Sequence, residues 1–554
     1  MDRVAAAVTG RRSWLLALIA AALGVGLMAV IGGNAAAGQS PQSVPVSAQS
    51  ARVDALARQF AGGETAPLIV VVTRIDGGAL AASDRAAAQA ARARALAAAQ
   101  PGANAAASPL LPSSDGRAAM AVVPLNAELS GLALADAVTT LRTAAATGLP
   151  AQLQVHVTGG PAFGADIAGA FAGANITLLA VTTAVVALLL IATYRSPVLW
   201  LVPLLVVGFA DRVAAAIGTA VASLTGLSFD GATSGITSVL VFGAGTNYAL
   251  LLISRYRQEL RRHCRHRAAL REAVRGAGPA IVASNATVVA ALLTLLLAST
   301  PSTRSLGALA ACGLAVAAIS VLVILPPLLA VGGRRLFWPF VPRPGDGDTL
   351  GSGAWLRVAE WVNRRPALVA TVTVAVLVGL GTGLLGTRIG LTQTEQFRVR
   401  ADSVVGYNAV AQHFPAGVTN PALIIGRTNL GASLRQAIIA TPGVVSVTES
   451  GRSRSGVTKW SAVIDAPPSS RQAFTAVAAL RDSTRAIDSA ALVGGPDAQA
   501  LDVRDAATHD RLLLIPAILA VILVVVYVVL RSALAPPTLL AATILGALAA
   551  LGMG

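Results

Sequence analysis

The sequence predicts a multi-pass α-helical membrane bundle with two α+β domains outside the membrane. Composition is the first reason. The chain of 554 residues is 55% hydrophobic and 12% charged, with a mean hydropathy of +0.69, whereas soluble domains are about 45–50% apolar and about 25% charged. Long apolar stretches alternate with arginine-rich links, and two long segments between them carry mixed helix and strand patterns.

Nine stretches are long enough for the about 20 apolar residues that a helix needs to cross the hydrocarbon core. They lie at 13–32, 175–194, 198–222, 233–254, 279–299, 305–332, 367–386, 512–530 and 535–554. The first stretch could also be a secretory signal, but the apolar part of a signal spans about 7–15 residues. Because 13–32 is longer, we expect a retained span.

Arginine placement predicts the orientation. Positively charged links stay on the cytoplasmic side, and the arginine-rich links follow the fourth and sixth stretches. Their arginines are Arg255, Arg257, Arg261, Arg262, Arg265, Arg267, Arg271 and Arg275, then Arg334, Arg335, Arg343, Arg357, Arg364 and Arg365. We therefore expect a cytoplasmic N-terminus in a bacterial inner membrane, with the odd-to-even links facing outward.

This topology divides the chain into eight parts. They are a cytoplasmic N-terminus 1–12, a first span 13–32, a first outward α+β domain 33–174, spans two to six within 175–333 with a basic cytoplasmic loop 255–278, a cytoplasmic linker 334–366, a seventh span 367–386, a second outward domain 387–511, and an eighth and ninth span within 512–554.

Both outward segments alternate strand and helix patterns, which predicts small βαβ sandwiches. In the first segment we expect strands at 68–72, 119–123 and 153–157, with helices at 83–99 and 132–147. The second segment repeats this logic. Its expected strands are 421–426, 443–449, 459–465 and 490–493, and its expected helices are 403–414, 431–440 and 470–486.

The two halves of the chain resemble each other. Gly159-Gly160-Pro161 ends the first outward segment and Gly494-Gly495-Pro496 ends the second, and each is followed by a helical stretch and a span. Parallel repeats of this kind are a known transporter plan. Four more spans follow the first of these, but the chain ends at Gly554 within the third span of the second half. We therefore expect the repeat to be incomplete and the chain to be truncated at its C-terminus.

One segment carries a family signature. The stretch Val241-Phe-Gly-Ala-Gly-Thr-Asn-Tyr-Ala-Leu-Leu-Leu-Ile-Ser-Arg-Tyr-Arg-Gln-Glu-Leu260 resembles the fourth helix of MMPL (mycobacterial membrane protein large) transporters, within the resistance-nodulation-division (RND) superfamily. Further matches are Gly159-Gly-Pro161, Tyr194-Arg-Ser-Pro197, Gly278-Pro-Ala-Ile281 and Leu336-Phe-Trp-Pro339. The resemblance covers essentially the whole chain.

The resemblance implies twelve helices, two porter-type periplasmic domains and proton-driven export of lipids or other hydrophobic molecules. It also implies a proton relay with one Asp-Tyr pair on the fourth helix and another on the tenth. This chain departs from that pattern, because Asn247-Tyr248 places an amide where the carboxylate would be, and no tenth helix is present.

Asp211 and Arg212 are an acidic and a basic residue inside the third predicted span. An ionisable group in the bilayer is costly and marks function by default. At 1.5 Å per residue, Asp211 lies about 18 Å and Asn247 about 12 Å above the arginine-rich end. Our hypothesis is that Asp211 carries the proton of the missing carboxylate, with Thr246, Asn247 and Tyr248 as hydrogen-bond partners. The alternative is a purely structural pair that bonds polar groups inside the bundle.

Gly243 and Gly245 flank the same motif, and small residues let membrane helices approach closely. We interpret them as packing residues, with a moving hinge as the alternative. Five acids in the outward segments are expected to be solvated surface or domain contacts rather than catalytic groups: Asp166, Glu395, Asp402, Asp502 and Asp505.

The residue types in the sequence also predict which metals, cofactors, lipids and substrates the protein binds. His263 and His266 are close, but nothing nearby completes a metal set, so we expect neither metal nor cofactor. The position of the basic loop explains its charge through contact with anionic lipid, which argues against nucleic acid. We expect membrane lipids, protons and a hydrophobic or lipid substrate as partners, and we leave a homo-oligomer open.

Three functions from different classes result. The first is a proton-coupled exporter of lipids or hydrophobic compounds. The second is a membrane receptor or assembly factor that keeps the fold without proton coupling, which Asn247 favours. The third, a membrane enzyme, is disfavoured because the outward segments show no set of nucleophile, base and acid.

Overall fold

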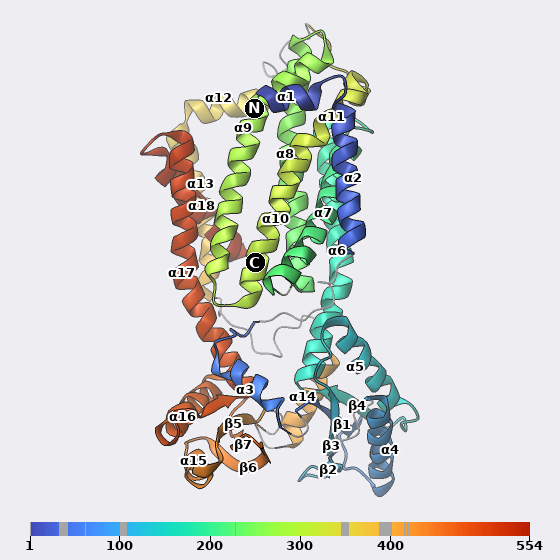
Figure 1. The fold of residues 1–554 in the computed structure, drawn as a ribbon, viewed down its shortest axis with the longest axis vertical. Helices are drawn as coiled ribbons and strands as arrows, with labels where there is room; N and C mark the ends of the chain where they lie inside the picture. The colour runs from blue at the N-terminus through green and yellow to red at the C-terminus, as the bar shows by residue number, and fades with distance from the viewer. Residues whose placement is uncertain are drawn as a thin grey trace.

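A helical bundle stands above two sheet domains in the computed structural model (Figure 1). The structure describes residues 2–32, 43–60, 63–99, 108–227, 229–344, 354–386, 401–414, 417 and 420–553. The arginine-rich links lie at the end of the bundle that faces away from the sheets, together with the short helices α1 (Asp2–Thr9) and α12 (Ala354–Arg364).

Long apolar helices make up the bundle. They are α2 (Ser13–Ile31), α6 (Gly160–Tyr194), α7 (Leu201–Thr225), α8 (Gly231–Arg262), α9 (His266–Leu293) with η2 (Thr294–Leu297), α10 (Pro301–Val323), α11 (Leu325–Gly332), η3 (Gly333–Phe337), α13 (Pro366–Gly381), η5 (Thr382–Gly386), α17 (Pro496–Leu530) and α18 (Ala535–Met553). Within the described residues, eight helices are long and apolar enough to cross a membrane, and 179–194 of α6 is a shorter apolar stretch. This agrees with the predicted multi-pass helical class.

The core of the bundle comes from the first half of the chain. Helices α7, α8 and α10 are at least half buried, whereas α13, α17 and α18 are mostly exposed at its edge (Figure 1). At the arginine-rich end, the rings of Tyr256 and Phe337 pack with centroids 5.8 Å apart, which fixes the last turns of α8 against η3.

The first sheet has the order β2-β3-β1-β4, and every pairing is antiparallel. Its strands are β1 (Thr65–Arg74), β2 (Leu111–Pro112), β3 (Ala118–Asn126) and β4 (Leu153–Thr158), with α4 (Ala82–Ala99) and α5 (Gly131–Ala146) as crossovers. Strand side chains alternate between faces. Leu68 and Val70 therefore face α4 and α5, whereas Ile69 and Val71 face the other way.

The second sheet repeats this arrangement with the order β6-β7-β5-β8. Its elements are α15 (Gly431–Ile439), α16 (Arg471–Ile487), β5 (Ala422–Arg427), η6 (Thr428–Leu430), β6 (Val444–Arg452), β7 (Val457–Ile464) and β8 (Leu492–Gly494). Trp460 and Ile424 pack under α15 and α16, and Ile425 and Leu492 point to the opposite face. Both domains thus have the split βαβ topology of ferredoxin-like folds.

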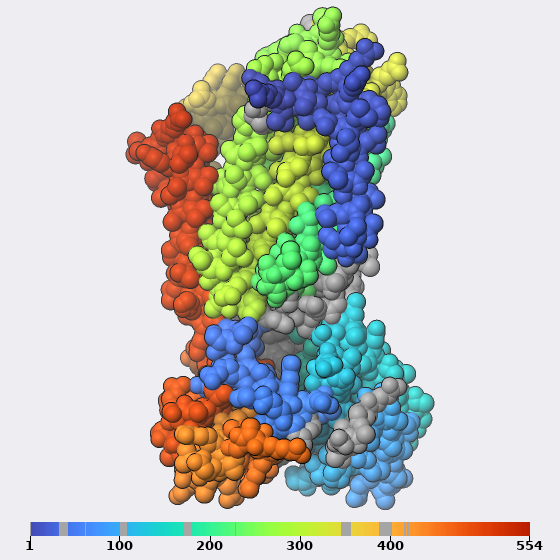
Figure 2. Space-filling view, in the orientation of Figure 1, coloured from blue at the N-terminus to red at the C-terminus, as the bar shows by residue number. Residues whose placement is uncertain are grey.

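Each sheet is completed by a helix from the other half of the chain. Helix α14 (Asp402–His413) packs on the first sheet, where Val410 joins Ile69 and Val71. Helix α3 (Gln49–Ala57) packs on the second sheet, where Val53 joins Ile425, and Figure 2 shows the blue residues of α3 against the orange second domain.

The exchange corrects one expectation from the sequence. The helix predicted at 403–414 was assigned to the second outward domain, but it covers the free face of the first sheet. Each sheet buries one face under its own crossover helices and leaves the other apolar, and in both domains the helix from the other half of the chain packs on that face. As stretches of chain, the domain boundaries 33–174 and 387–511 stay predictions.

Glycine permits both contacts. A Cβ at Gly494 of β8 would lie 2.6 Å from the Cβ and Cγ1 atoms of Val53, and a Cβ at Gly406 of α14 would lie 3.0 Å from the Cβ of His156. Atoms at 2.6 Å overlap, so a side chain at Gly494 would push α3 away from the second sheet.

We predict that Gly494→Ala destabilises the second domain by about 1–3 kcal/mol, the cost of overpacking a close contact. The apparent thermal unfolding midpoint of the purified protein should fall. Gly160→Ala is the matched control because a Cβ there meets no atom within 4 Å. An unchanged midpoint for Gly494→Ala would contradict the tight seating of α3.

Candidate functional site

Asp211 lies about halfway along α7 and is buried in the bundle, with 4% of its side chain exposed. Its Oδ2 accepts a hydrogen bond from Nε of Arg212 at 3.0 Å, and Nη2 of the same guanidinium donates to this oxygen as well. Consecutive side chains on a helix diverge by about 100°, so Arg212 folds back to make the pair, and its side chain is 49% exposed. The carboxylate faces inward while the guanidinium lies at the edge of the bundle.

Neighbouring contacts fix the level of Asp211 against α8. A Cβ at Gly245 would lie 3.0 Å from Val207, one turn before Asp211. A Cβ at Gly313 of α10 would lie 2.8 Å from Val241 and 3.8 Å from Ala214, just after Asp211. Asp211 therefore lies level with the turn that begins at Val241, one helical turn away from Gly245.

The expected hydrogen bonds from the α8 motif to Asp211 are absent among the described contacts. Thr246 is buried, and its Oγ1 has no hydrogen-bond partner there. Tyr248 donates from its hydroxyl to Oδ1 of Asn285 on α9, at 3.3 Å, and Asn247 is exposed on the surface of the bundle. The depths derived from the sequence, about 18 and 12 Å, were expected to be comparable, but the contacts of Gly245 and Gly313 place the two groups about one helical turn of 5.4 Å apart.

The two glycines of the motif have different surroundings. Gly245 is buried at the crossing of α7, α8 and α10, because a Cβ there would press on Val207 and lie 3.5 Å from Ala317. Gly243 is exposed, and a Cβ there would meet nothing within 4 Å. Close helix approach therefore involves Gly245 and not Gly243.

Asp510 connects the second half of the chain to the first, and no sequence pattern had indicated this residue. This carboxylate of α17 is 5% exposed and accepts four hydrogen bonds at the start of α10. The donors are the backbone N–H and hydroxyl of Ser299, both at 2.7 Å, and those of Thr300, at 3.1 and 2.7 Å. A carboxylate is favourable at a helix N-terminus, so Asp510 caps α10 from another helix.

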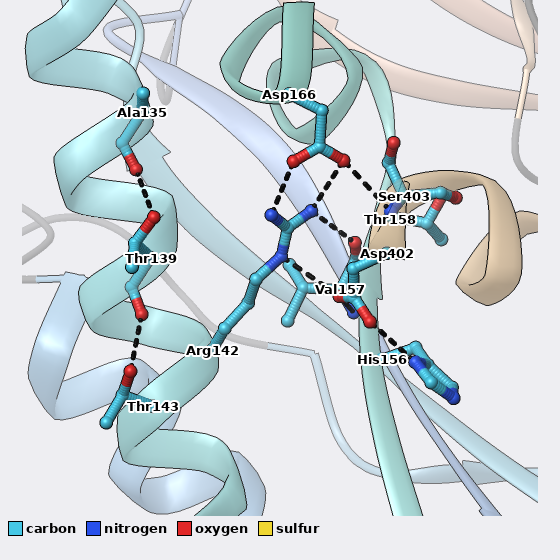
Figure 3. Close-up of polar contacts among 10 residues, drawn as sticks. All are labelled: Ala135, Thr139, Arg142, Thr143, His156, Val157, Thr158, Asp166, Asp402 and Ser403. Carbon is cyan, nitrogen blue, oxygen red and sulfur yellow. Dashed lines mark hydrogen bonds and ion pairs between the residues drawn. The ribbon is translucent and has the colours of Figure 1, made fainter. Parts of the chain in front are cut away.

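Figure 3 shows the polar network that seats α14 on the first domain. Arg142 of α5 makes two hydrogen bonds to the carboxylate of Asp166 of α6, at 2.5 and 2.9 Å. Asp166 in turn accepts the backbone N–H of Ser403 at 3.1 Å, which caps the start of α14. Asp402 accepts from the backbone N–H of Val157 at 3.1 Å and lies 2.6 Å from Nδ1 of His156.

Arg142 also approaches Asp402. Its Nε lies 2.9 Å from Oδ2 of Asp402, which is an ion pair by distance, although the N–H is not aimed at that oxygen. Bidentate pairs between arginine and carboxylate add geometric specificity, so the Asp166 contact sets the position of the guanidinium.

In the second domain, an equivalent arginine–aspartate pair binds the start of α3. Arg481 of α16 binds the carboxylate of Asp502 of α17 at 2.8 and 2.9 Å. Asp502 accepts from the backbone N–H of Ser50 at 3.2 Å and from its hydroxyl at 2.6 Å. An arginine, an aspartate and the second residue of the exchanged helix thus form equivalent clamps in both halves.

Of the five outward acids, Asp166, Asp402 and Asp502 join a domain to its exchanged helix, and Asp505 is exposed on α17. Glu395 lies outside the described residues. Burial alone would raise the pKa of Asp402, but the hydrogen bonds from His156 and Val157 and the charge of Arg142 outweigh it and lower the pKa. Within the described residues no group of three His, Cys, Asp or Glu side chains could hold a metal ion.

Comparison with known proteins assigns the chain. The model of the MMPL family matches residues 39–369 and 449–554. The chain belongs to the MMPL family. It is 38% identical over 516 residues to the "Putative membrane protein ActII-3" of Streptomyces coelicolor, covering 92% of this chain and 71% of that protein.

Two further relatives carry transport names. The "Apo-petrobactin exporter" of Bacillus anthracis is 29% identical over 73% of this chain and 58% of its own length. The "Probable transport protein MmpL10" of Mycobacterium leprae is 28% identical over 57% of this chain and 32% of its own length. This MMPL-family chain is therefore a multi-pass membrane protein of a transporter family within the RND superfamily.

We predict that Asp402→Asn weakens the seating of α14 by about 1–3 kcal/mol at neutral pH, because buried donors lose a charged acceptor. Since the pKa of Asp402 is lowered in the folded state, its contribution is present above the ordinary value of about 3.9 and is lost as pH falls below it. The thermal midpoint of Asp402→Asn should be reduced at pH 7 and should change less than wild type on acidification towards pH 3.

The exposed Asp136→Asn on the same domain is the matched control for this measurement. Equal midpoints for wild type and Asp402→Asn at pH 7 would show that the network does not hold the helix.

Proposed function

We propose that this protein exports lipids or other hydrophobic or amphiphilic compounds across the bacterial inner membrane, driven by the proton gradient. The observation that carries the proposal is Asp211, a carboxylate buried half-way along an apolar helix. Such a group is retained against a cost of about 2.5–3.5 kcal/mol on insertion scales, and a transporter uses it to take up and release a proton.

The ion pair between Asp211 and Arg212 couples protonation of Asp211 to a movement of Arg212. Ionised Asp211 is attracted to the guanidinium, and protonation removes the attraction and frees Arg212 to extend towards the edge of the bundle. Helix α7 meets α8 through the contact of Val207 with Gly245, one turn away. A change at Asp211 therefore alters the position of α7 against α8.

The helices α6 and α17 carry movement between the bundle and the sheets. Each is a continuous helix of 35 residues that begins beside a sheet and ends at the arginine-rich end of the bundle. Both end in an arginine in the left-handed conformation, Arg195 and Arg531. Together with the matching strand orders, this supports two porter-type repeats that face outward, with the N-terminus in the cytoplasm.

An apolar groove supports the class of substrate. It has a volume of about 410 Å³ and lies between α2, α7 and α11. Its wall includes Trp14, Leu18, Phe209, Pro327 and Val331. A groove of this composition accepts a hydrocarbon chain from the bilayer and offers almost no polar contact.

The second candidate is a membrane receptor or assembly factor without proton coupling. The observation that favours it is the exposed amide of Asn247, at the position where the family places a relay carboxylate, together with the absence of any hydrogen bond between this motif and Asp211 among the described residues. We propose no catalytic role.

Asp211→Asn tests the export mechanism in proteoliposomes with an imposed pH gradient. The probe is a fluorescent phospholipid, and movement between leaflets is followed by chemical quenching of the outer leaflet. We expect gradient-stimulated movement with wild type, and with Asp211→Asn only the rate seen without a gradient.

Asp136→Asn controls for the loss of a carboxylate and should behave as wild type. Gradient-stimulated movement that persists in Asp211→Asn would refute the role of Asp211. No stimulation in wild type would favour the receptor or assembly function.

A further inference from the structure

A polar cavity of about 470 Å³ lies between the first sheet and α14. It is at the ends of the strands that point away from the bundle, where Thr73 of β1 pairs with Ala118 of β3 and with Gln154 of β4. The apolar groove described above lies in the bundle, so this cavity is separate from it.

The residues that line the cavity are basic or neutral, and none of those described is acidic. The described lining residues include two arginines, two histidines and three residues with carboxamide side chains. These side chains are Arg74, Arg117, His156, His413, Gln154, Asn408 and Gln412.

Aspartates that do not line the cavity pair with three of its four basic side chains. Arg74 is paired with Asp76 at 3.0 Å and with Asp84 at 2.8 Å. His413 places its Nδ1 2.7 Å from Oδ2 of Asp115. Hydrogen bonds from Ser113 and the Arg117 backbone, and then from His413, lower the pKa of Asp115, so it is an ionised acceptor.

An ionised aspartate also determines which ring nitrogen of His156 carries a proton. Asp402 is ionised because its pKa is lowered, and an ionised carboxylate only accepts hydrogen bonds. Nδ1 of His156 must therefore carry the proton. Its other nitrogen, Nε2, is buried and has no partner in the described part of the chain. A buried polar atom without a partner costs free energy, and here it lies on a residue that lines the cavity.

Arg117 supplies the charge that is not already compensated. Its guanidinium makes no ion pair with any described residue, whereas the other cavity arginine makes two. Arg117 precedes β3, and His156 lies on β4, so the two flank the central strand β1. Neighbouring strands are about 4.8 Å apart, so β3 and β4 are separated by about twice that distance, with β1 between them.

We propose that this cavity binds a phosphate group. Ligand oxygens carrying negative charge would accept hydrogen bonds from Arg117 and the carboxamides, and the P–OH of the singly protonated group would donate to Nε2 of His156. The aspartates that pair with Arg74, His156 and His413 are not among the described lining residues, and their pairing orients these side chains. Free phosphate and the headgroup of an amphiphile share this chemistry.

Calorimetric titration of the full chain tests the site, in nanodiscs of phosphatidylcholine so that the bilayer adds no phosphate monoester. The probes are inorganic phosphate and dihexanoyl phosphatidic acid. We expect at least one to bind to wild type and Arg117→Gln to bind it at least tenfold more weakly, with Arg117→Lys recovering part of the affinity. Arg454→Gln is the control, an exposed arginine on the second domain.

The two probes separate the two sources. Binding of both identifies a general phosphate site, and binding of phosphatidic acid alone identifies a headgroup site. Absence of binding by either probe at millimolar concentration, or equal affinity in wild type and Arg117→Gln, would overturn the proposal. Arg117 is exposed, so an unchanged thermal midpoint should accompany the variant and exclude misfolding.

Discussion

The structure depends on keeping charge and unbonded backbone out of the hydrocarbon. Only helices satisfy every backbone group within one segment of a membrane protein, and the bundle consists of helices for that reason. The arginines gather at one end and the folded domains at the other. Asp211 and Arg212 are the exception half-way along α7, and each neutralises the other. In the proposed function, this charged pair is the place in the bundle where a proton is taken up and released.

The exchanged helices explain how two small sheets become one unit. A four-stranded sheet with helices on one face leaves an apolar face uncovered, and each half of the chain covers the face of the other. The clamps Arg142–Asp166–Ser403 and Arg481–Asp502–Ser50 repeat the same chemistry. Since the two aspartates lie on α6 and α17, each of these helices is joined to one domain and to the exchanged helix that covers it. Asp510 adds a third link, between α17 and the start of α10.

The local sequence pattern was sufficient to predict helices and strands, but it did not predict which elements pack against each other. The predicted strand 68–72 lies within β1, and the predicted helix 431–440 corresponds to α15, because periodicity and turn residues are properties of short segments. The partner of α14 is set by an apolar sheet face more than 200 residues away, which no local signal encodes. The same holds for Asp510, whose partners Ser299 and Thr300 are ordinary loop residues. For Asp211, the sequence placed the charge inside the bundle, but a one-turn offset between helices decided which groups it meets.

Orientation is the most direct test of this account, and the chain contains its own probe. Cys264 is exposed in the arginine-rich link between α8 and α9, and Cys312 lies inside the bundle on α10. With Cys312→Ser as background, a membrane-impermeant maleimide should label Cys264 in inverted vesicles and leave it unlabelled in intact cells. Labelling of Cys264 in intact cells would place the arginines outside the membrane and contradict the topology on which the transport mechanism rests.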